Sequence, residues 1–299
     1  MSDSASLTQF TRAAERAANQ IIRAYSTSFG LATRLLGTRH RQHVRNIYAL
    51  VRVADELVDG VTDEAGLTVE QQRRALEHMV AETDRALRLG CSSDLIIHAF
   101  ARTARASRID SSLTGPFFAS MRTDLDARAT GPAGVAGFDA AAHEEYVYGS
   151  AEVVGLMCLR VFLRDEHVDA AESAQLEHGA RMLGAAFQNV NFLRDLRDDT
   201  ARLGRSYLGT ADRLTDADRE RWVRTIRAQL AAAAAAIPLL PKDARAAVRS
   251  AHALFGALTD RIAATTVDEL YRSRVRVPDP TKARLVTGAL VTTWTERPA

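Results

Sequence analysis

Four polar side chains recur at helical spacing late in the chain. They are Gln188, Asn191, Asp195 and Asp199, at steps of three, four and four residues. A helix would therefore carry two amides and two carboxylates on one face, beside a stripe of apolar residues that packs into a core. A carboxylate facing an apolar interior is costly unless it is paired or bound to a cation. The segment predicts a site for a charged group.

A second acidic helix is predicted far upstream. Asp55 and Asp59 again lie one helical turn apart, with Arg52 and Tyr48 each one turn further back. One such acidic pair is common on exposed helix faces, but here two pairs have apolar flanks and nearby arginines. Carboxylates suit Mg²⁺, which completes its shell with water and substrate phosphates, while arginine holds phosphate oxygens that the metal leaves free. The two segments together predict a metal–diphosphate site.

The composition describes an ordinary globular protein. Its 299 residues, 46% of them hydrophobic, can bury one large core, so we expect a single domain over 1–299 with its core at about 15–280. The net charge is +2, and lysine occurs only at Lys242 and Lys282. This near balance gives no reason to expect nucleic-acid binding.

Several other classes of protein are disfavoured. The first residues lack the pattern of a secretion signal, and no apolar run approaches the roughly 20 residues that span a bilayer. No histidine spacing typical of zinc enzymes and no glycine-rich phosphate loop occurs in the sequence. Cys91 and Cys158 are far apart and read as reduced thiols. We expect a cytoplasmic protein, with at most peripheral contact at the inner face of the membrane.

The apolar periodicity predicts an all-α chain, because no segment alternates for long enough to form a sheet. The expected helices cover 8–24, 31–36, 42–59, 69–90, 92–106, 111–127, 139–163, 169–200, a hairpin interrupted at Pro238 and Pro241, 243–265 and 280–294. Residues 38–43 are predicted to form a basic turn on the surface, and residues 131–134 a loop.

These segments resemble, in order, the squalene/phytoene synthase family of isoprenoid synthases. The resemblance rests on Ser26-Thr27-Ser28-Phe29, Tyr48, Arg52, Asp55, Asp59, Tyr146-Val147-Tyr148-Gly149, Gln188, Asn191, Arg194, Asp195, Asp199, Gly204-Arg205-Ser206-Tyr207-Leu208 and Arg276-Val277-Pro278. It covers nearly the whole chain. It implies the isoprenoid synthase fold, a single-domain helical bundle around a central cavity.

The resemblance also implies a reaction, the head-to-head condensation of two prenyl diphosphates. The implied ligands of Mg²⁺, or alternatively Mn²⁺, are Asp55, Asp59, Asn191, Asp195 and Asp199. The implied diphosphate contacts are Ser26, Thr27, Ser28, Tyr48, Arg52, Gln188, Arg194 and Arg205. Tyr146 and Tyr207 would line the reaction zone and, with the four aspartates, form the catalytic set. Ionising an allylic diphosphate leaves a carbocation and an anion, so metals and arginines stabilise the leaving charge while apolar walls exclude water.

Three positions depart from the common pattern of the family. Thr27 stands where many members carry Lys or Arg, so one contact would be missing or supplied by Arg39 or Arg41. Glu152 replaces a small residue, and Phe255 replaces a tyrosine. These departures bear on substrate placement and leave the metal chemistry intact.

We expect two geranylgeranyl diphosphates to be joined to phytoene through prephytoene diphosphate, with loss of a proton and without NADPH. Alternatives are a farnesyl diphosphate enzyme that makes squalene or dehydrosqualene, a member diverted to another prenyl transfer or cyclisation, and a non-catalytic assembly factor. Phe117, Phe118 and Met157 read equally well as cavity floor or as core.

The expected product is a hydrocarbon that is insoluble in water. Membrane contact near the cavity mouth, through Leu285 to Trp294, is therefore an expectation, with ordinary helix packing as its alternative. Downstream carotenoid enzymes are the expected protein partners.

Overall fold

The computed structural model describes the backbone of residues 4–26, 28–130, 139–198, 208 and 213–296. All regular structure in these residues is helical and none of it is strand, which confirms the predicted all-α class. None of the helices in these ranges is long and apolar enough to cross a bilayer.

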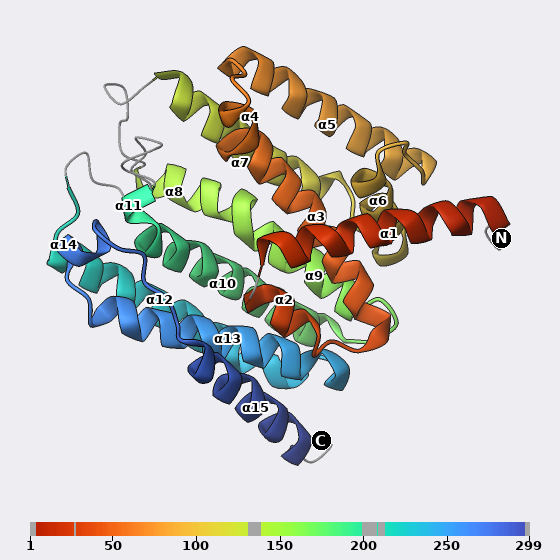
Figure 1. Cartoon of the computed structure of the whole chain (residues 1–299). Coiled ribbons are helices and arrows are strands. Elements are labelled where there is room, and N and C mark those ends of the chain that lie inside the picture. Colours follow the sequence, from red (N-terminus) through yellow and green to blue (C-terminus); the bar gives the residue numbers. More distant parts are fainter. Residues whose placement is uncertain (1–3, 27, 131–138, 199–207, 209–212, 297–299) are drawn as a thin grey trace.

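Figure 1 shows the order of the helices along the chain. In chain order they are α1 (Ala5–Tyr25), α2 (Ser28–Thr33), α3 (Thr38–Asp59), α4 (Val61–Glu64), α5 (Val69–Leu89), α6 (Leu95–Ser107), α7 (Ser111–Thr130), α8 (Ala140–Val147), the π-helical η1 (Tyr148–Glu152), α9 (Val153–Phe162), α10 (Ala170–Arg194), α11 (Leu196–Asp198), α12 (Asp216–Ala236), the 3₁₀ turn η3 (Ile237–Leu239), α13 (Lys242–Ala263), α14 (Val267–Leu270) and α15 (Asp279–Thr295).

Side-chain caps set many of the helix starts. Each capping side chain accepts a hydrogen bond from a backbone N–H in the first turn, which has no partner inside the helix. The capping residues are Ser4, Thr68, Asp94, Asp139, Asp169 and Thr215. Gly90 ends α5 in the left-handed conformation, with φ of 79°, which glycine adopts without steric cost.

Helix α10 lies in the middle of the bundle (Figure 1). It packs against α12 and α13 on one side and against α9 and η1 on the other. Helix α3 packs against α7 and α9, and the short α2 contacts both α3 and α13. This arrangement brings the two acidic segments, at the carboxyl ends of α3 and α10, toward a common space.

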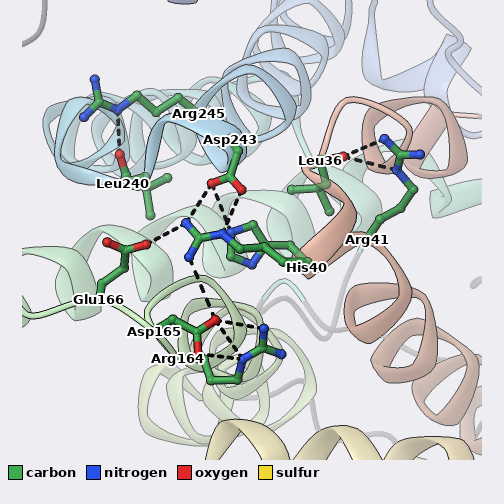
Figure 2. Close-up of polar contacts among 10 residues, drawn as sticks. Leu36, His40, Arg41, Arg164, Asp165, Glu166, Leu240, Asp243 and Arg245 are labelled. Atoms are coloured by element: carbon green, nitrogen blue, oxygen red, sulfur yellow. Dashed lines mark hydrogen bonds and ion pairs between the residues drawn. The ribbon is translucent and has the colours of Figure 1, made fainter.

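Residues 38–43 form the first turns of α3, so their assignment to a surface turn was wrong. The Arg39 guanidinium binds Asp243 at 2.8 Å and Glu166 at 2.6 Å. Figure 2 shows the Asp243 carboxylate next to His40, with Glu166 nearby. His40 is buried, with Nε2 3.1 Å from the Asp243 carboxylate. These carboxylates lie 204 and 127 residues away from Arg39 in the chain, so no local pattern could have indicated them.

The same contacts answer the suggestion that Arg39 or Arg41 replaces a diphosphate contact. Arg39 is bound to Asp243 and Glu166, and Arg41 donates to the Leu36 carbonyl at 2.8 Å. Neither guanidinium is among the described side chains that line the central cavity. The suggestion was wrong, because both arginines already hold the amino-terminal end of α3 in place.

Three large apolar residues belong to the core. Phe117, Phe118 and Met157 are at most 1% exposed and join one hydrophobic cluster. None of them is among the described residues that line the cavity. The structure thus assigns them to the core and not to the cavity floor.

His43 lies in a buried polar network between α3 and α6. Arg164 donates to its Nε2 at 2.7 Å, so Nδ1 carries the proton and donates to Thr103 Oγ1 at 2.9 Å. Burial, followed by the charge of Arg164, lowers the pKa of His43 to about 4. The folded protein therefore keeps this imidazole neutral at pH values where the unfolded chain protonates it.

We expect this histidine to make folding sensitive to acid. Its folded pKa is depressed, so the free energy of unfolding should fall as the pH drops from about 6.5 to about 4, by at most about 1.4 kcal/mol per pH unit from this group. Denaturant unfolding of wild type and His43→Gln at pH values of about 7.5, 5.5 and 4.5 measures this loss of the free energy of unfolding. The difference in the free energy of unfolding between wild type and His43→Gln should become smaller as the pH falls. A difference that stays the same at all three pH values would contradict the role of His43.

Candidate active site

A central cavity of about 1080 Å³ opens inside the bundle. Its polar lining gathers toward the carboxyl ends of α3 and α10, where Asp55 and Asp195 lie. Its lining from the amino-terminal halves of these helices is apolar and includes Val44 and Leu176. A cavity that is charged at one end and apolar along its length suits an amphiphile with an anionic head.

Helix α3 presents an excess of negative charge to this cavity. Asp55 and Asp59 both line it, one turn apart. Burial, followed by the charge of Asp59, raises the pKa of Asp55 to about 8, against the opposing effect of Arg52. A carboxyl group with so high a pKa is mostly ionised at neutral pH only when a nearby cation lowers that pKa.

Three further residues of the predicted site line the same region. Ser26 is hydrogen-bonded to Tyr48, and burial is the main cause that raises the pKa of the Tyr48 hydroxyl. The Arg52 guanidinium lies 4.6 Å from the centre of the Tyr25 ring and forms an ion pair with Glu56. The arginine is thus held at the cavity wall by a ring and a carboxylate.

Helix α10 contributes Gln188, Asn191 and Arg194 to the lining. The Oδ1 atom of Asn191 is buried and has no hydrogen-bond partner among the described residues. A buried acceptor without a donor is costly, and an oxygen of this kind can serve as a ligand of a hard cation.

Asp195 follows α10, and of the acidic residues 195, 198 and 199 it is the one whose side chain is described. The predicted continuous helix over 169–200 is wrong at this point, because α10 ends at Arg194 and Asp195 takes a non-helical conformation. Its carboxylate binds Arg194 at 2.5 Å and Arg274 at 2.6 Å. Two guanidiniums therefore compensate the charge of Asp195, and one of them comes from a segment 79 residues away.

Several predicted residues cannot be placed. Thr27, Asp199, Arg205 and Tyr207 lie outside the described residues, and of Ser28 only the backbone is described. In the part of the chain that the structure describes, no three His, Cys, Asp or Glu side chains gather closely enough to hold a metal ion. The proposed ligand set therefore stays a prediction.

The residues present nevertheless fit a divalent cation. The burial of Asp55 and the charge of Asp59 beside it raise the pKa of Asp55, and the buried Oδ1 atom of Asn191 has no hydrogen-bond partner among the described residues. Mg²⁺ takes few protein ligands and keeps room for water and phosphate oxygens, so an open site of this kind suits it better than a closed cage.

Sequence reasoning gave no role to five charged residues that line the cavity, namely Asp124, Arg274, Arg276, Asp279 and Lys282, although Arg276 belongs to one of the motifs that resemble the family. The alternating arginines 272, 274 and 276 form a basic run that could have been noticed. Asp124 shares an apolar helix face with Phe117 and Met121, so its type and spacing also carried a signal.

Two of the departures from the family pattern can be placed. Phe255 stacks on Phe187 with ring centres 3.7 Å apart, and both rings line the cavity. Glu152 is buried and binds Arg181 at 2.7 Å. It is not among the described lining residues, so its charge is neutralised away from the cavity.

The protein is thus all-α, and its large cavity carries acidic and basic side chains at one end. Residues 22–281 match the family model Squalene/phytoene synthase. The chain belongs to the squalene/phytoene synthase family, as the sequence motifs predicted.

Relatives and solved structures agree with this membership. The chain is 29% identical over 290 residues to phytoene synthase 3, chloroplastic, of Zea mays, covering 91% of this chain and 64% of the relative. It is 28% identical over 203 residues to 4,4'-diapophytoene synthase of Staphylococcus haemolyticus, covering 64% of this chain and 61% of the relative. The chain thus spans less than two thirds of either protein.

The fold matches that of solved relatives. A dehydrosqualene synthase in complex with ligand gives a TM-score of 0.73 at 21% identity, over 97% of this chain and 100% of that one. Squalene synthase HpnC from Alicyclobacillus acidocaldarius gives 0.68 at 16% identity, over 89% and 97%. The expected isoprenoid synthase fold is confirmed.

We expect Mg²⁺ with inorganic diphosphate to stabilise the protein through Asp55. At a hundred times the dissociation constant, a ligand adds about 2.7 kcal/mol, which corresponds to a Tm increase of about 4 °C for a chain of this size. Thermal unfolding with and without the two ligands measures this increase. Asp55→Asn should lose most of it.

The matched control is Asp260→Asn, which removes an exposed carboxylate of α13 that binds Arg227. It should keep the wild-type increase in Tm. An equal increase in all three proteins would contradict a role for Asp55 in binding the metal.

Proposed function

We propose that the protein is a Mg²⁺-dependent prenyltransferase that joins two prenyl diphosphates head to head and releases diphosphate. The observation that carries this proposal is one cavity that combines Asp55, Asp59 and Asp195 with arginines at one end and apolar walls along its length. The head groups would bind at the charged end, and the hydrocarbon chains would lie along the apolar part.

In this proposal the charged end holds the leaving group. Asp55, Asp59, Asn191 and Asp195 would hold Mg²⁺, which stabilises the negative charge that develops on the departing diphosphate. Arg52 and Arg194 would contact the remaining oxygens, as their guanidiniums already face the cavity. Contacts of this kind favour ionisation because they strengthen as the charge develops.

Arg274 and Arg276, on the segment that leads into α15, and Lys282, in the first turn of α15, extend the basic lining. Arg274 is bound to Asp195 in the structure, so both partners change neighbours when Asp195 turns to a cation and the guanidinium to a diphosphate. The exchange keeps each charge compensated, which avoids the cost of an unpaired charge in the cavity.

The apolar walls protect the carbocation that ionisation would leave. The stacked rings of Phe187 and Phe255 belong to these walls, and aromatic faces attract a cation. Phe255 supplies this face without the hydroxyl group of the more common tyrosine. Apolar walls exclude water, so the carbocation does not react with water before it reacts with the second prenyl chain.

For the substrate, we favour geranylgeranyl diphosphate and a phytoene product formed without NADPH. The maize relative, named a phytoene synthase, aligns over more of this chain than does the staphylococcal diapophytoene synthase. The second candidate is a farnesyl diphosphate enzyme that makes squalene or dehydrosqualene, and the staphylococcal relative supports it.

We further propose that a cytoplasmic enzyme would release its hydrocarbon at a membrane surface. Helix α15 begins beside Lys282 at the cavity and exposes Leu290, Val291 and Trp294, the last of them 84% exposed. An exposed apolar face near the cavity suits contact with lipid.

Incubation of the purified protein with labelled farnesyl or geranylgeranyl diphosphate, with and without NADPH, tests the proposed reaction. We expect turnover of the C20 substrate to a hydrocarbon without reductant, and loss of turnover in EDTA. Asp195→Asn should reduce turnover by about two orders of magnitude or more, because the loss of one group that stabilises charge in the transition state has an effect of this size.

Each other outcome removes one part of the proposal. Exclusive use of the C15 substrate removes the geranylgeranyl assignment, and full activity in EDTA removes the metal. Absence of turnover with either substrate and Mg²⁺ would favour the non-catalytic assembly factor.

A further inference from the structure

Tyr146 and Asp124 form a buried pair at the cavity wall. The Tyr146 hydroxyl donates to both oxygens of the Asp124 carboxylate, at 3.0 and 2.9 Å. Tyr146 is 7% exposed and Asp124 2% exposed, and both line the cavity. Because a carboxylate only accepts hydrogen bonds, the phenolic proton lies on the Asp124 side of the tyrosine oxygen.

Helix α7 also holds the backbone of Tyr146. Ser120, one turn before Asp124, donates its hydroxyl to the Tyr146 carbonyl at 3.1 Å. Helix α7 therefore fixes both ends of the tyrosine, the carbonyl through Ser120 and the hydroxyl through Asp124. A side chain held at both ends loses little freedom when a reacting group arrives.

The chain after Tyr146 is shaped to permit this contact. The π-helical turn η1 begins at Tyr148, and Gly149 lies so close to α7 that a Cβ there would come within 2.3 Å of the Pro116 carbonyl oxygen. Short π-helical turns are frequent at functional sites. Glycine is required here because any side chain would push η1, and Tyr146 with it, away from α7.

The electrostatic consequence favours a cation in the cavity. A phenol that donates to a carboxylate becomes more electron-rich at its oxygen, and the carboxylate adds a negative charge directly behind it. The single hydroxyl proton of Tyr146 is shared between the two oxygens of Asp124. The charge of Asp124 also contributes to the raised pKa of Asp55.

We propose that Asp124 is a positioning residue that turns the Tyr146 oxygen toward the carbocation, and that the pair takes up the proton lost when the hydrocarbon forms. The carbon–hydrogen electron pair becomes the new double bond, the proton passes to Tyr146 Oη, and the phenolic proton passes to Asp124. The cation and the carboxylate are both neutralised. This inference rests on the proposed function and assigns it a proton acceptor.

The test compares Asp124→Asn, Tyr146→Phe and the double variant with wild type. Each single variant should still consume prenyl diphosphate, while the fraction that becomes hydrocarbon falls about a hundredfold, which is the lower end of a general-base contribution. The diphosphate intermediate and water-quenched alcohols should accumulate. Since the pair acts as a unit, the double variant should be no worse than the poorer single variant, within about a factor of two.

Asp126→Asn is the matched control. It makes the same change on the same helix, but Asp126 is exposed and binds Arg73 at the surface. Its product distribution should equal that of wild type. Retention of the Tm increase with Mg²⁺ and diphosphate in Asp124→Asn would show that this variant is folded and keeps its charged end.

A measurement without substrate tests the contact itself. In protein labelled with ¹³Cζ-tyrosine, the resonance missing from Tyr146→Phe identifies Tyr146 among the six tyrosines. That resonance should shift in Asp124→Asn and stay in place in Asp126→Asn. An unchanged resonance in Asp124→Asn would overturn the inference.

The outcomes separate the two proposals. A wild-type protein that consumes no prenyl diphosphate contradicts the proposed function, whatever the tyrosine resonance does. Wild-type turnover together with a wild-type hydrocarbon fraction in Asp124→Asn overturns only the role of Asp124. Multiplying losses in the double variant would likewise overturn it, because they would show independent effects.

Discussion

The structure depends on how negative charge is compensated inside a largely apolar cavity. The two acidic segments solve this differently. Asp195 is paired with Arg194 and Arg274, whereas Asp55 is partly buried beside Asp59 and its pKa rises to about 8. The α3 side is therefore the side that gains most from a cation, and the α10 side brings guanidiniums that can bind an anion. The proposed metal with its bound diphosphate would supply a cation to the one side and an anion to the other.

Small residues decide where the walls of the cavity stand. A Cβ on Gly155 would lie 2.5 Å from the Ala180 carbonyl oxygen, and one on Gly184 would lie 2.6 Å from that of Ala151. A Cβ on Gly179 would meet the Ala236 Cβ at 2.3 Å. These glycines let α9, η1 and α12 approach α10 closely, so the helices close around the cavity without large side chains filling it.

Local patterns predicted much of the fold and part of the site. Apolar periodicity predicted the helices, and the spacing of Asp55 and Asp59 placed both carboxylates on one face of α3. The local patterns gave wrong predictions where residues far apart in the chain form ion pairs. Residues 38–43 begin α3, and Asp243 and Glu166 neutralise Arg39 there. The helix predicted over 169–200 is broken at Asp195, which meets Arg274, before the short α11.

The sequence by itself determined the all-α class, the acidic pairs and the family, because helical periodicity and motif spacing are local properties of the chain. Only the tertiary structure decided which charges meet. It joined Asp124 to Tyr146 across two helices and brought Arg274 to Asp195. Such contacts depend on how whole helices pack against one another. The sequence around each residue does not show which distant helix it will meet.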